Sequence, residues 1–562
     1  MALMLRVSRH RDPRGPPTPR GIHLKCAANG TILYPQPSDS PNDPLNWPLW
    51  RRDVITCILC LLSVVASTLS PLLAANTLTL TLYFRPPRNF EEVALLTRWH
   101  LFGAGVTGFL IVPSGRIWGK RHLYIFGTVI IIISSIWGGA SGNNYNSLLA
   151  VRVFQGVGLA PFEAFVNHSV GDMYSVHQRG KRMALSNLCL FGGAFFTPVI
   201  VGKMTNSIGW QWTFYFVAIF GGMLLPLLIF LCPETAYRRD DSLASSRNGH
   251  ELNDNPPPQH SGASSVETKQ PEGDTPPGSR TQNMPPPPVL SRANLALFNG
   301  RKTDESFVKL LRPFPLFFHP GIFWACLTQR LIIGWTVLIG IVLAAIMLGS
   351  PLFFDEVQTG YMYTGAFIGA LVGFALAGLL ADSSAKWMTK RNGGVYEPEF
   401  RLMLVIPMLI FGYAGLYGFG ITSANTFRYG WFWPDFFFAL EVIGMVLGAV
   451  ASALYVVDAH KDVAIEAFTC LLIFKNIFSF GLTFSGLSWL VEGGVEETFT
   501  AISSVQVVVF CLTLLMCRST LNSSSHCGGI GMFADSGVTD VFGKKNRSFF
   551  ARHDILKMLR LD

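Results

Sequence analysis

Long apolar runs alternate with short polar stretches along this chain, and the runs fall into two groups of six. They lie near residues 54–75, 95–114, 123–141, 147–169, 183–203 and 211–232, and near 321–348, 359–381, 401–422, 433–457, 464–490 and 500–518. A helix of about 20 apolar residues crosses the ~30 Å hydrocarbon core of a bilayer. The pattern therefore predicts an all-α membrane protein with 12 transmembrane helices in two six-helix bundles, as in many secondary transporters.

Polar segments divide the chain around these two bundles. The predicted parts are a cytoplasmic N-terminal tail (1–53), an N-terminal six-helix bundle (54–232), a cytoplasmic central loop (233–320), a C-terminal six-helix bundle (321–518) and a cytoplasmic C-terminal tail (519–562). The central loop contains Asn255-Pro-Pro-Pro and Met284-Pro-Pro-Pro-Pro among Ser, Gly, Gln and charged residues. Such a stretch buries too little apolar surface to offset the entropy of ordering it, so we expect about 240–298 to be disordered.

Composition agrees with a bilayer environment and argues against several other classes of protein. Of the 562 residues, 50% are hydrophobic and 14% are charged, whereas soluble domains carry about 25% charge. The basic residues form no stripe interleaved with aromatic residues, which argues against nucleic-acid binding. The sequence contains neither a G-x-x-x-x-G-K-[ST] nucleotide loop nor an H-E-x-x-H zinc motif. We therefore expect no enzyme activity, no cofactor and no metal, and we expect the membrane potential and proton gradient to supply the energy.

The distribution of Lys and Arg among the short loops predicts the orientation in the membrane. The loops on one side hold Arg116, Lys120, Arg121, Arg179, Lys181, Arg182, Lys386, Lys390, Arg391, Arg401 and Lys461, whereas those on the other side hold Arg85, Arg88, Arg98, Lys203 and Arg428. Loops rich in Lys and Arg face the cytoplasm. We therefore expect both termini and the central loop to lie inside the cell. We also expect a monomer, located in the plasma membrane.

Several motifs in the loops and helices resemble those of fungal transporters. They are Asn42-Asp-Pro-Leu-Asn-Trp-Pro48, Gly119-Lys-Arg121, Arg152-Val-Phe-Gln-Gly156, His177-Gln-Arg-Gly-Lys-Arg182, Gly209-Trp-Gln-Trp-Thr213, Pro233-Glu-Thr-Ala-Tyr237 and Asn392-Gly-Gly-Val-Tyr-Glu-Pro-Glu-Phe-Arg401. Together they resemble the twelve-span drug:proton antiporter group of the fungal major facilitator superfamily. The resemblance implies the major facilitator fold and proton-coupled movement of a small solute by alternating access.

The loop after the second span departs from the superfamily pattern Gly-x-x-x-Asp-Arg-x-Gly-Arg-Arg. Arg116 stands where that pattern has Asp, so the charge lock that this Asp usually makes lacks its acidic partner in the N-terminal half. The C-terminal half keeps Gly378-x-x-x-Asp382 and a basic residue after it. The cytoplasmic gate is assigned to Gly119, Lys120, Arg121, Asp382, Lys386 and Glu466.

Charged residues inside the predicted spans are candidate functional residues, because a charge at mid-membrane usually faces a cavity or a partner. Arg152 and Glu163 are eleven residues apart in the fourth span. At 100° per residue they share nearly the same helix face, about 16 Å apart along the axis. The resemblance implies a role in proton coupling for Arg152. Alternatively, Arg152 is a structural pin that binds carbonyl groups of a neighbouring helix, and Glu163 pairs with an arginine in a loop.

Two later spans carry further candidates for proton or substrate binding. Lys475 lies deep in the eleventh span beside Asn476, and Glu441 lies in the tenth. Glu441 either takes up and releases a proton or pairs with another helix, and the sequence does not separate these alternatives. Arg330 in the seventh span is also deep.

The fifth span carries a motif of small residues around a proline. Gly192, Gly193, Pro198 and Gly202 resemble the antiporter motif, with Thr197 in place of the Gly before Pro. Small residues let helices approach closely, and Pro kinks a helix. The resemblance favours a role for these four residues in a hinge and in helix packing.

Taken together, the sequence favours a proton-coupled exporter of small amphipathic or cationic organic compounds. Its expected partners are the small-molecule substrate, protons and the lipid bilayer. One alternative is a proton-coupled importer of a nutrient such as a polyamine. Another is a nutrient sensor that uses a transporter scaffold without transporting.

Overall fold

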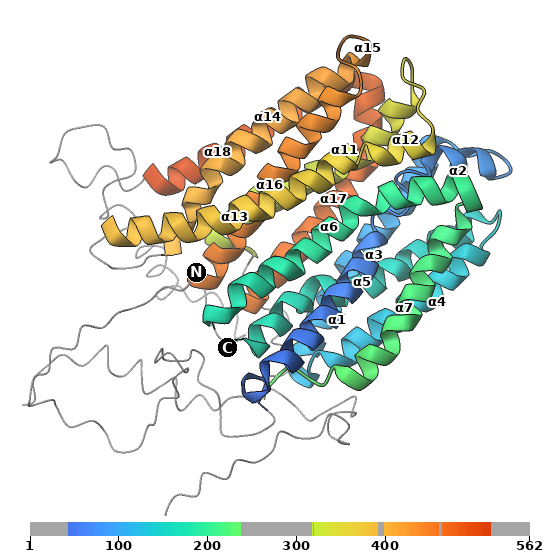
Figure 1. The fold of residues 1–562 in the computed structure, drawn as a ribbon. Helices are drawn as coiled ribbons and strands as arrows, with labels where there is room; N and C mark the ends of the chain where they lie inside the picture. Colours follow the sequence, from blue (N-terminus) through green and yellow to red (C-terminus); the bar gives the residue numbers. More distant parts are fainter. Residues whose placement is uncertain are drawn as a thin grey trace, which may run out of the picture.

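The computed structural model describes residues 43–174, 176–237, 317–318, 320–391, 398–459 and 464–518, and all regular structure in these residues is helical (Figure 1). The first half contains α1 (Leu49–Thr68), α2 (Thr77–Tyr83), α3 (Phe90–Trp118), α4 (Arg121–Ala140), α5 (Tyr145–Met173), α6 (Val176–Ile208) and α7 (Gln211–Leu231). The second half contains α11 (Pro320–Leu348), α12 (Glu356–Tyr361), α13 (Thr364–Arg391), α14 (Val405–Ala424), α15 (Thr426–Tyr429), α16 (Phe432–Ala459), α17 (Ala464–Gly493) and α18 (Val495–Arg518). Short 3-10 helices cover Pro44–Asn46 and Pro398–Leu404.

Within the described residues, 9 helices are long and apolar enough to cross a membrane. They correspond to the predicted spans from 95–114 to 433–457, so the chain is a multi-pass membrane protein. The predicted spans 54–75, 464–490 and 500–518 are largely helical as α1, α17 and α18 but are not among these 9. Twelve spans in two six-helix bundles therefore stay a prediction. Most of the predicted central loop and both tails lie outside the described residues.

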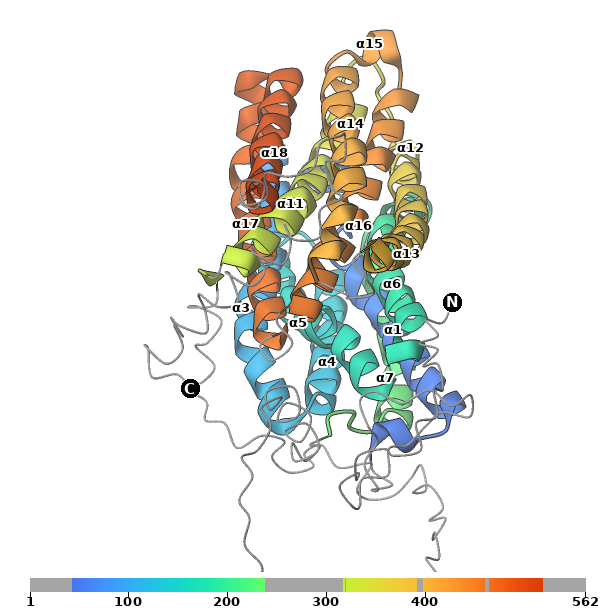
Figure 2. The ribbon, with the colours of Figure 1, turned by 90° about the vertical axis from the view of Figure 1, so that its left-hand side faces the viewer.

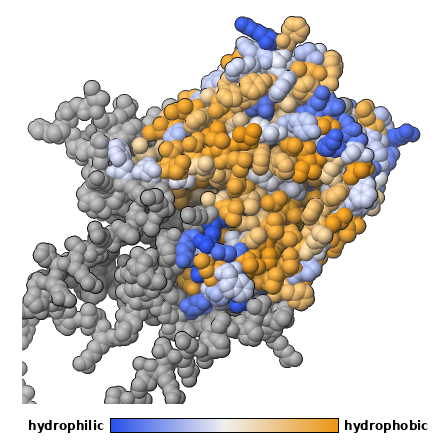
Figure 3. All heavy atoms as spheres, viewed as in Figure 1, coloured by the Kyte–Doolittle hydropathy of each residue, from blue (hydrophilic) through white to orange (hydrophobic). Residues whose placement is uncertain are grey.

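The long helices run roughly alongside one another, and their outer surface is apolar. The face shown in Figure 3 is mostly hydrophobic between more hydrophilic areas. Large apolar side chains point outward from several helices: Ile133, Leu379 and Val508 are 58%, 67% and 63% exposed. Water would disfavour such a surface, whereas lipid chains are as apolar as these side chains. The exterior therefore suits a bilayer.

Polar residues at the helix ends explain where several helices begin and end. Asn89 and Glu92 form a capping box at the start of α3. Asn144 accepts a hydrogen bond from the Ser147 N–H at 3.1 Å and so begins α5. Gly119, at φ +96°, ends α3 in a conformation that favours glycine. These local signals separate α3, α4 and α5 with short connections.

The buried apolar residues form two clusters, one in each half of the chain. One cluster takes its residues from Trp47 to Cys232, together with Leu472 of α17. The other takes its residues from Ile322 to Val509, together with Ala94 of α3. Each half therefore has its own core, and α3 and α17 each contribute a buried residue to the core of the opposite half. Phe191, Phe195 and Val199 of α6 also pack against the core of the second half. The helices of the two halves are seen from a second side in Figure 2.

Small residues on α3 allow α17 to approach closely. A Cβ added at Gly105 would lie 3.1 Å from the Cβ of Asn476, and one added at Gly108 would lie 2.6 Å from Leu472. Such a close approach is possible only where side chains are small. Gly105 faces α17, whereas Gly103, two residues earlier and so on nearly the opposite side of α3, faces Val153 of α5.

A second close contact joins α6 to α12, at the end of the helices predicted to face away from the cytoplasm. A Cβ at Gly202 would collide with the Glu356 carbonyl, and one at Gly360 would lie 2.6 Å from the Pro198 carbonyl oxygen. Nearby, Thr79 of α2 donates a hydrogen bond to the Glu356 carboxylate at 2.6 Å. Gly193 packs instead against α1, where an added Cβ would lie 2.6 Å from Ser67 Oγ. The small residues of the fifth predicted span thus lie at helix contacts, and their role as a hinge stays a prediction.

Replacing Gly202 tests this contact. Gly202→Val should lower the thermal unfolding midpoint of the purified protein, because overpacking of this kind typically costs about 1–3 kcal/mol. Gly222→Val is the matched control, since no atom lies within 4 Å of a Cβ added at Gly222 in α7. Equal midpoints for the two variants would contradict the close approach of α6 and α12.

Candidate functional site

Arg152 of α5 is fully buried and binds backbone groups of the neighbouring segments. Its Nη1 donates to the Leu69 carbonyl at 2.7 Å and to Gln155 Oε1 at 2.8 Å. Its Nη2 donates to the Ser70 carbonyl and its Nε to the Leu96 carbonyl, each at 3.3 Å. These contacts are those of the structural pin, and a planar guanidinium suits them because it presents donors in several directions.

Gly156 places Arg152 at this point. A Cβ at Gly156 would collide with the His100 carbonyl, and one at Gly103 would collide with the Val153 carbonyl. Because both residues are glycine, the backbones of α3 and α5 approach closely enough for Arg152 to reach the carbonyl of Leu96 on α3. The motif that contains Arg152 and Gly156 therefore also determines the packing of the two helices.

Glu163 of α5 forms an ion pair with Lys475 of α17, across the boundary between the two halves. The Asn476 amide donates to the other carboxylate oxygen, Glu163 Oε2, at 3.2 Å. The side chains of Lys475 and Glu163 are only 13% and 11% exposed. Arg152 and Glu163 do not contact each other, although they lie on the same helix: Arg152 points to the backbone of its own half and Glu163 points to the opposite half.

A histidine lies between these two sites. His100 of α3 is fully buried, and its Nε2 is 3.2 Å from Ser70 Oγ, next to the carbonyl that Arg152 binds. His100 is close enough to Arg152 and Lys475 for their charges to interact. Charged residues within apolar helices draw attention in a sequence, but a histidine is less conspicuous, and the sequence analysis did not select His100.

Glu441 lies in the core of the second half, apart from the Glu163–Lys475 pair. Its Oε1 accepts a hydrogen bond of 2.7 Å from Thr336 of α11, and the side chain is 0% exposed. Its Oε2 has no hydrogen-bond partner in the part of the chain that the structure describes. Glu441 thus accepts a hydrogen bond from a neighbouring helix, and its role in proton movement stays a prediction.

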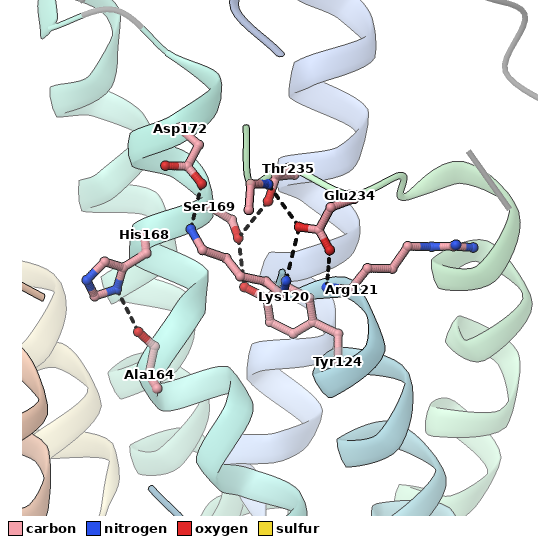
Figure 4. Close-up of polar contacts among 10 residues, drawn as sticks. Lys120, Arg121, Tyr124, Ala164, His168, Ser169, Asp172, Glu234 and Thr235 are labelled. Carbon is pink, nitrogen blue, oxygen red and sulfur yellow. Dashed lines mark hydrogen bonds and ion pairs between the residues drawn. The ribbon is translucent and has the colours of Figure 1, made fainter. Parts of the chain in front are cut away.

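Glu234 supplies a carboxylate next to the predicted gate residues Lys120 and Arg121 (Figure 4), and the same carboxylate lies against Gly119. Its two oxygens each accept a backbone N–H at 3.0 Å, one from Lys120 and one from Arg121. Negative charge is favourable at this position because the first N–H groups of a helix have no partner within the helix. Glu234 therefore caps α4 in the half where the Asp of the superfamily pattern is replaced by Arg116.

The side chains of Lys120 and Arg121 extend the same cluster. Lys120 Nζ forms an ion pair of 2.6 Å with Asp172 of α5. Arg121 donates to the carbonyls of Cys232 at 3.0 Å and of Ile229 at 2.8 Å. The cluster ties α4, α5 and the end of α7 together within the first half. The side chains of the other predicted gate residues, Asp382, Lys386 and Glu466, lie outside the described part of the structure.

The helical fold, the apolar exterior and the buried charges between two halves define a membrane transporter. The sequence pattern of the Major Facilitator Superfamily matches residues 54–464, and the chain belongs to this superfamily. It is therefore a transporter and not an enzyme.

Fungal transporters are among the relatives of the chain. Protein HOL1 of Saccharomyces cerevisiae is 26% identical over 543 residues, covering 88% of this chain and 90% of that protein. The MFS transporter cpaT of Aspergillus oryzae is 25% identical over 466 residues, covering 81% of this chain and 85% of the relative. Among solved structures, the proton:xylose symporter XylE has a TM-score of 0.53 at 13% identity, over 83% of this chain and 96% of the symporter chain. The structural likeness supports the fold, and the narrower drug:proton antiporter group is not established by these relatives.

Arg152→Lys tests the importance of the planar guanidinium. The ammonium keeps the charge but cannot reach the acceptors on Leu69, Leu96 and Gln155 together. Each buried carbonyl left without a donor costs about 1–3 kcal/mol, so the unfolding midpoint should fall and gradient-driven transport should drop severely. Arg428→Lys is the control, because Arg428 is exposed and lies over the Tyr429 ring. A wild-type midpoint and flux in Arg152→Lys would show that these contacts contribute little.

Proposed function

We propose that this chain is a proton-coupled secondary transporter that moves a small organic solute by alternating access, with Glu163 as the proton-binding carboxylate. The observation that carries the proposal is the contact of Glu163 with Lys475 and Asn476 across the two halves. Alternating access requires the halves to move relative to each other around a central site. A carboxylate bound by the opposite half is well placed to couple that movement to a proton.

The coupling follows from the charge of Glu163. An ionised Glu163 attracts Lys475 and accepts the Asn476 amide, and both contacts favour the present arrangement of the halves. A proton on Glu163 removes its negative charge and so weakens the attraction to Lys475. Protonation therefore favours arrangements in which α5 and α17 separate at this level.

Arg152 has a supporting role in this proposal. Its guanidinium binds the carbonyls of Leu69, Ser70 and Leu96, which holds α5 against the segments before it. The position of Glu163 on the same helix then depends on Arg152. In this proposal Arg152 does not bind the proton itself. It holds α5 in place and so contributes to proton coupling indirectly.

The direction of transport depends on the charge of the solute. A cationic solute competes with a proton for Glu163, which gives antiport and export, as the sequence resemblance favours. An anionic solute binds better when Glu163 is protonated, which gives movement of proton and solute together. The cytoplasmic position of both termini belongs to the same proposal and rests on the Lys and Arg distribution. The plasma membrane is proposed as the location.

Glu163→Gln tests the proposal directly. A panel of toxic compounds and nitrogen sources, applied to cells with and without the chain, first identifies a transported solute. Flux of that solute is then measured in vesicles over a range of pH values. Because Gln cannot take up a proton, the variant should lose the pH dependence of the wild type more completely than it loses expression.

Two further variants complete this experiment. Glu492→Gln, at an exposed position of α17, should keep the wild-type pH profile. Glu441→Gln distinguishes the second buried carboxylate. If Glu163→Gln keeps the wild-type pH profile while Glu441→Gln loses it, the proton-binding role belongs to Glu441 and the proposal for Glu163 is wrong.

A further inference from the structure

Arg330 of α11 differs from the other charged residues inside the protein, because no partner for it is found in the described residues. No hydrogen bond or ion pair joins its guanidinium to any of them, and its Nε is buried without an acceptor. Arg152 has four acceptors and Lys475 has Glu163. An arginine inside a membrane protein is costly unless it is paired or faces a ligand.

The packing of α11 against α17 shows at which level along the helices Arg330 lies. A Cβ added at Gly334 of α11 would lie 2.6 Å from the ring of Phe478 of α17. Further along both helices, a Cβ added at Gly486 would collide with Leu338. Residue numbers increase in the same direction on both, so the helices run parallel. Arg330 is one turn before Gly334 on the same face, and so lies about one turn before the level of Phe478.

Lys475 is also about one turn before Phe478 in α17, so Arg330 and Lys475 lie at the same level. Arg330, Lys475 and Glu163 come from three different helices, and each is close enough to the other two for their charges to interact. Glu441, the other buried carboxylate of the second half, is not among the charges that act on Arg330. The unpaired guanidinium therefore belongs to the boundary between the halves, beside the ion pair.

The charges at this level do not balance. Lys475 and Arg330 carry two positive charges, and Glu163 carries one negative charge, which leaves one positive charge without a counter-charge. His100 is near both Lys475 and Arg152, and neither His100 nor Arg152 adds a negative charge. Asn476 is neutral. The level of Glu163, Lys475 and Arg330 therefore favours an anion over a cation.

We propose that Arg330 binds a carboxylate of the transported solute, so that the substrate class is an organic acid anion. A guanidinium with free donors suits a carboxylate because both groups are planar and can form two parallel hydrogen bonds. The inference rests on the proposed function, which places the solute between the halves. It departs from the amphipathic or cationic solutes that the sequence favours.

The sign of proton coupling follows from this substrate class. Glu163 contacts Lys475 and Asn476 of α17, and the charge of Arg330 of α11 acts on it. His100 of α3, which is near both Arg152 and Lys475, is another titratable group close to this site. A proton on Glu163 removes the one negative charge at this level and strengthens the attraction for an anion. Proton and solute then bind together, which is symport and, with an inward proton gradient, import.

Equilibrium binding of three small probes tests the inference. The full chain in lipid nanodiscs is titrated at neutral pH with benzoate, benzylammonium and benzyl alcohol, which share a ring and differ in charge. Binding is followed by tryptophan fluorescence, since Trp335 lies in the same helix as Arg330, α11, and packs against Phe478 of α17. Benzoate should bind with the highest affinity of the three, and Arg330→Gln should weaken its binding about tenfold or more, because a charged hydrogen bond is lost.

Three variants and a change of pH separate the possible results. Arg330→Lys should keep part of the affinity, and Arg428→Gln, at an exposed position, should leave it unchanged. Monodisperse size-exclusion profiles show that each variant is folded. Tighter binding of benzoate at pH 6 than at pH 8, lost in Glu163→Gln, would support the coupling as well. If binding needs Arg330 but does not vary with pH, the anion site stands and the proposed role of Glu163 fails.

Other results would overturn the inference. Benzylammonium binding more tightly than benzoate would assign the site to cations. Equal benzoate affinity in the wild type and Arg330→Gln, or no measurable binding of any probe to the wild type, would equally rule out an anion site at Arg330. A pH profile altered in Arg330→Gln with benzoate binding unchanged would show that Arg330 acts only on Glu163.

Discussion

The cost of a charge inside a membrane determines how the centre of this protein is built. A charged side chain there requires a partner, and the partner must be held in place by the packing of the helices. Arg152 meets this requirement within one half, through carbonyl groups of neighbouring segments. Glu163 meets it only through the opposite half, through Lys475 and Asn476. The first contact therefore stabilises a half, and the second depends on how the two halves are arranged.

Glycines make both contacts possible. Gly156 and Gly103 bring α3 against α5, so that Arg152 reaches Leu96. Gly105 brings α3 against α17 beside Asn476. The helix α3 thus lies between the site within the first half and the site between the halves. A movement of α17 relative to α3 would break the contacts of Glu163 and leave those of Arg152 intact, which is the separation of roles that alternating access needs.

Hydropathy predicts much of this fold from the sequence, because a bilayer demands long apolar helices. Arg152, Glu163 and Lys475 are also found from the sequence, since charges stand out in apolar runs. The pairing of Glu163 with Lys475 cannot be predicted from the sequence, because these residues are 312 positions apart and nothing local fixes the register of α5 against α17. Glu234 was also missed as a functional residue. It lies in a recognised motif, yet its capping of α4 depends on where the chain returns after α7.

A double-mutant cycle on Glu163 and Lys475 tests the central claim most directly. The free energy of unfolding is compared for the wild type, Glu163→Gln, Lys475→Gln and the double variant in lipid nanodiscs at neutral pH. Removing one partner of a buried ion pair leaves the other charge uncompensated and costs about 3–5 kcal/mol. We predict that each single variant is destabilised and that the double variant loses clearly less than the sum of the two. Strictly additive losses would contradict an ion pair between the halves.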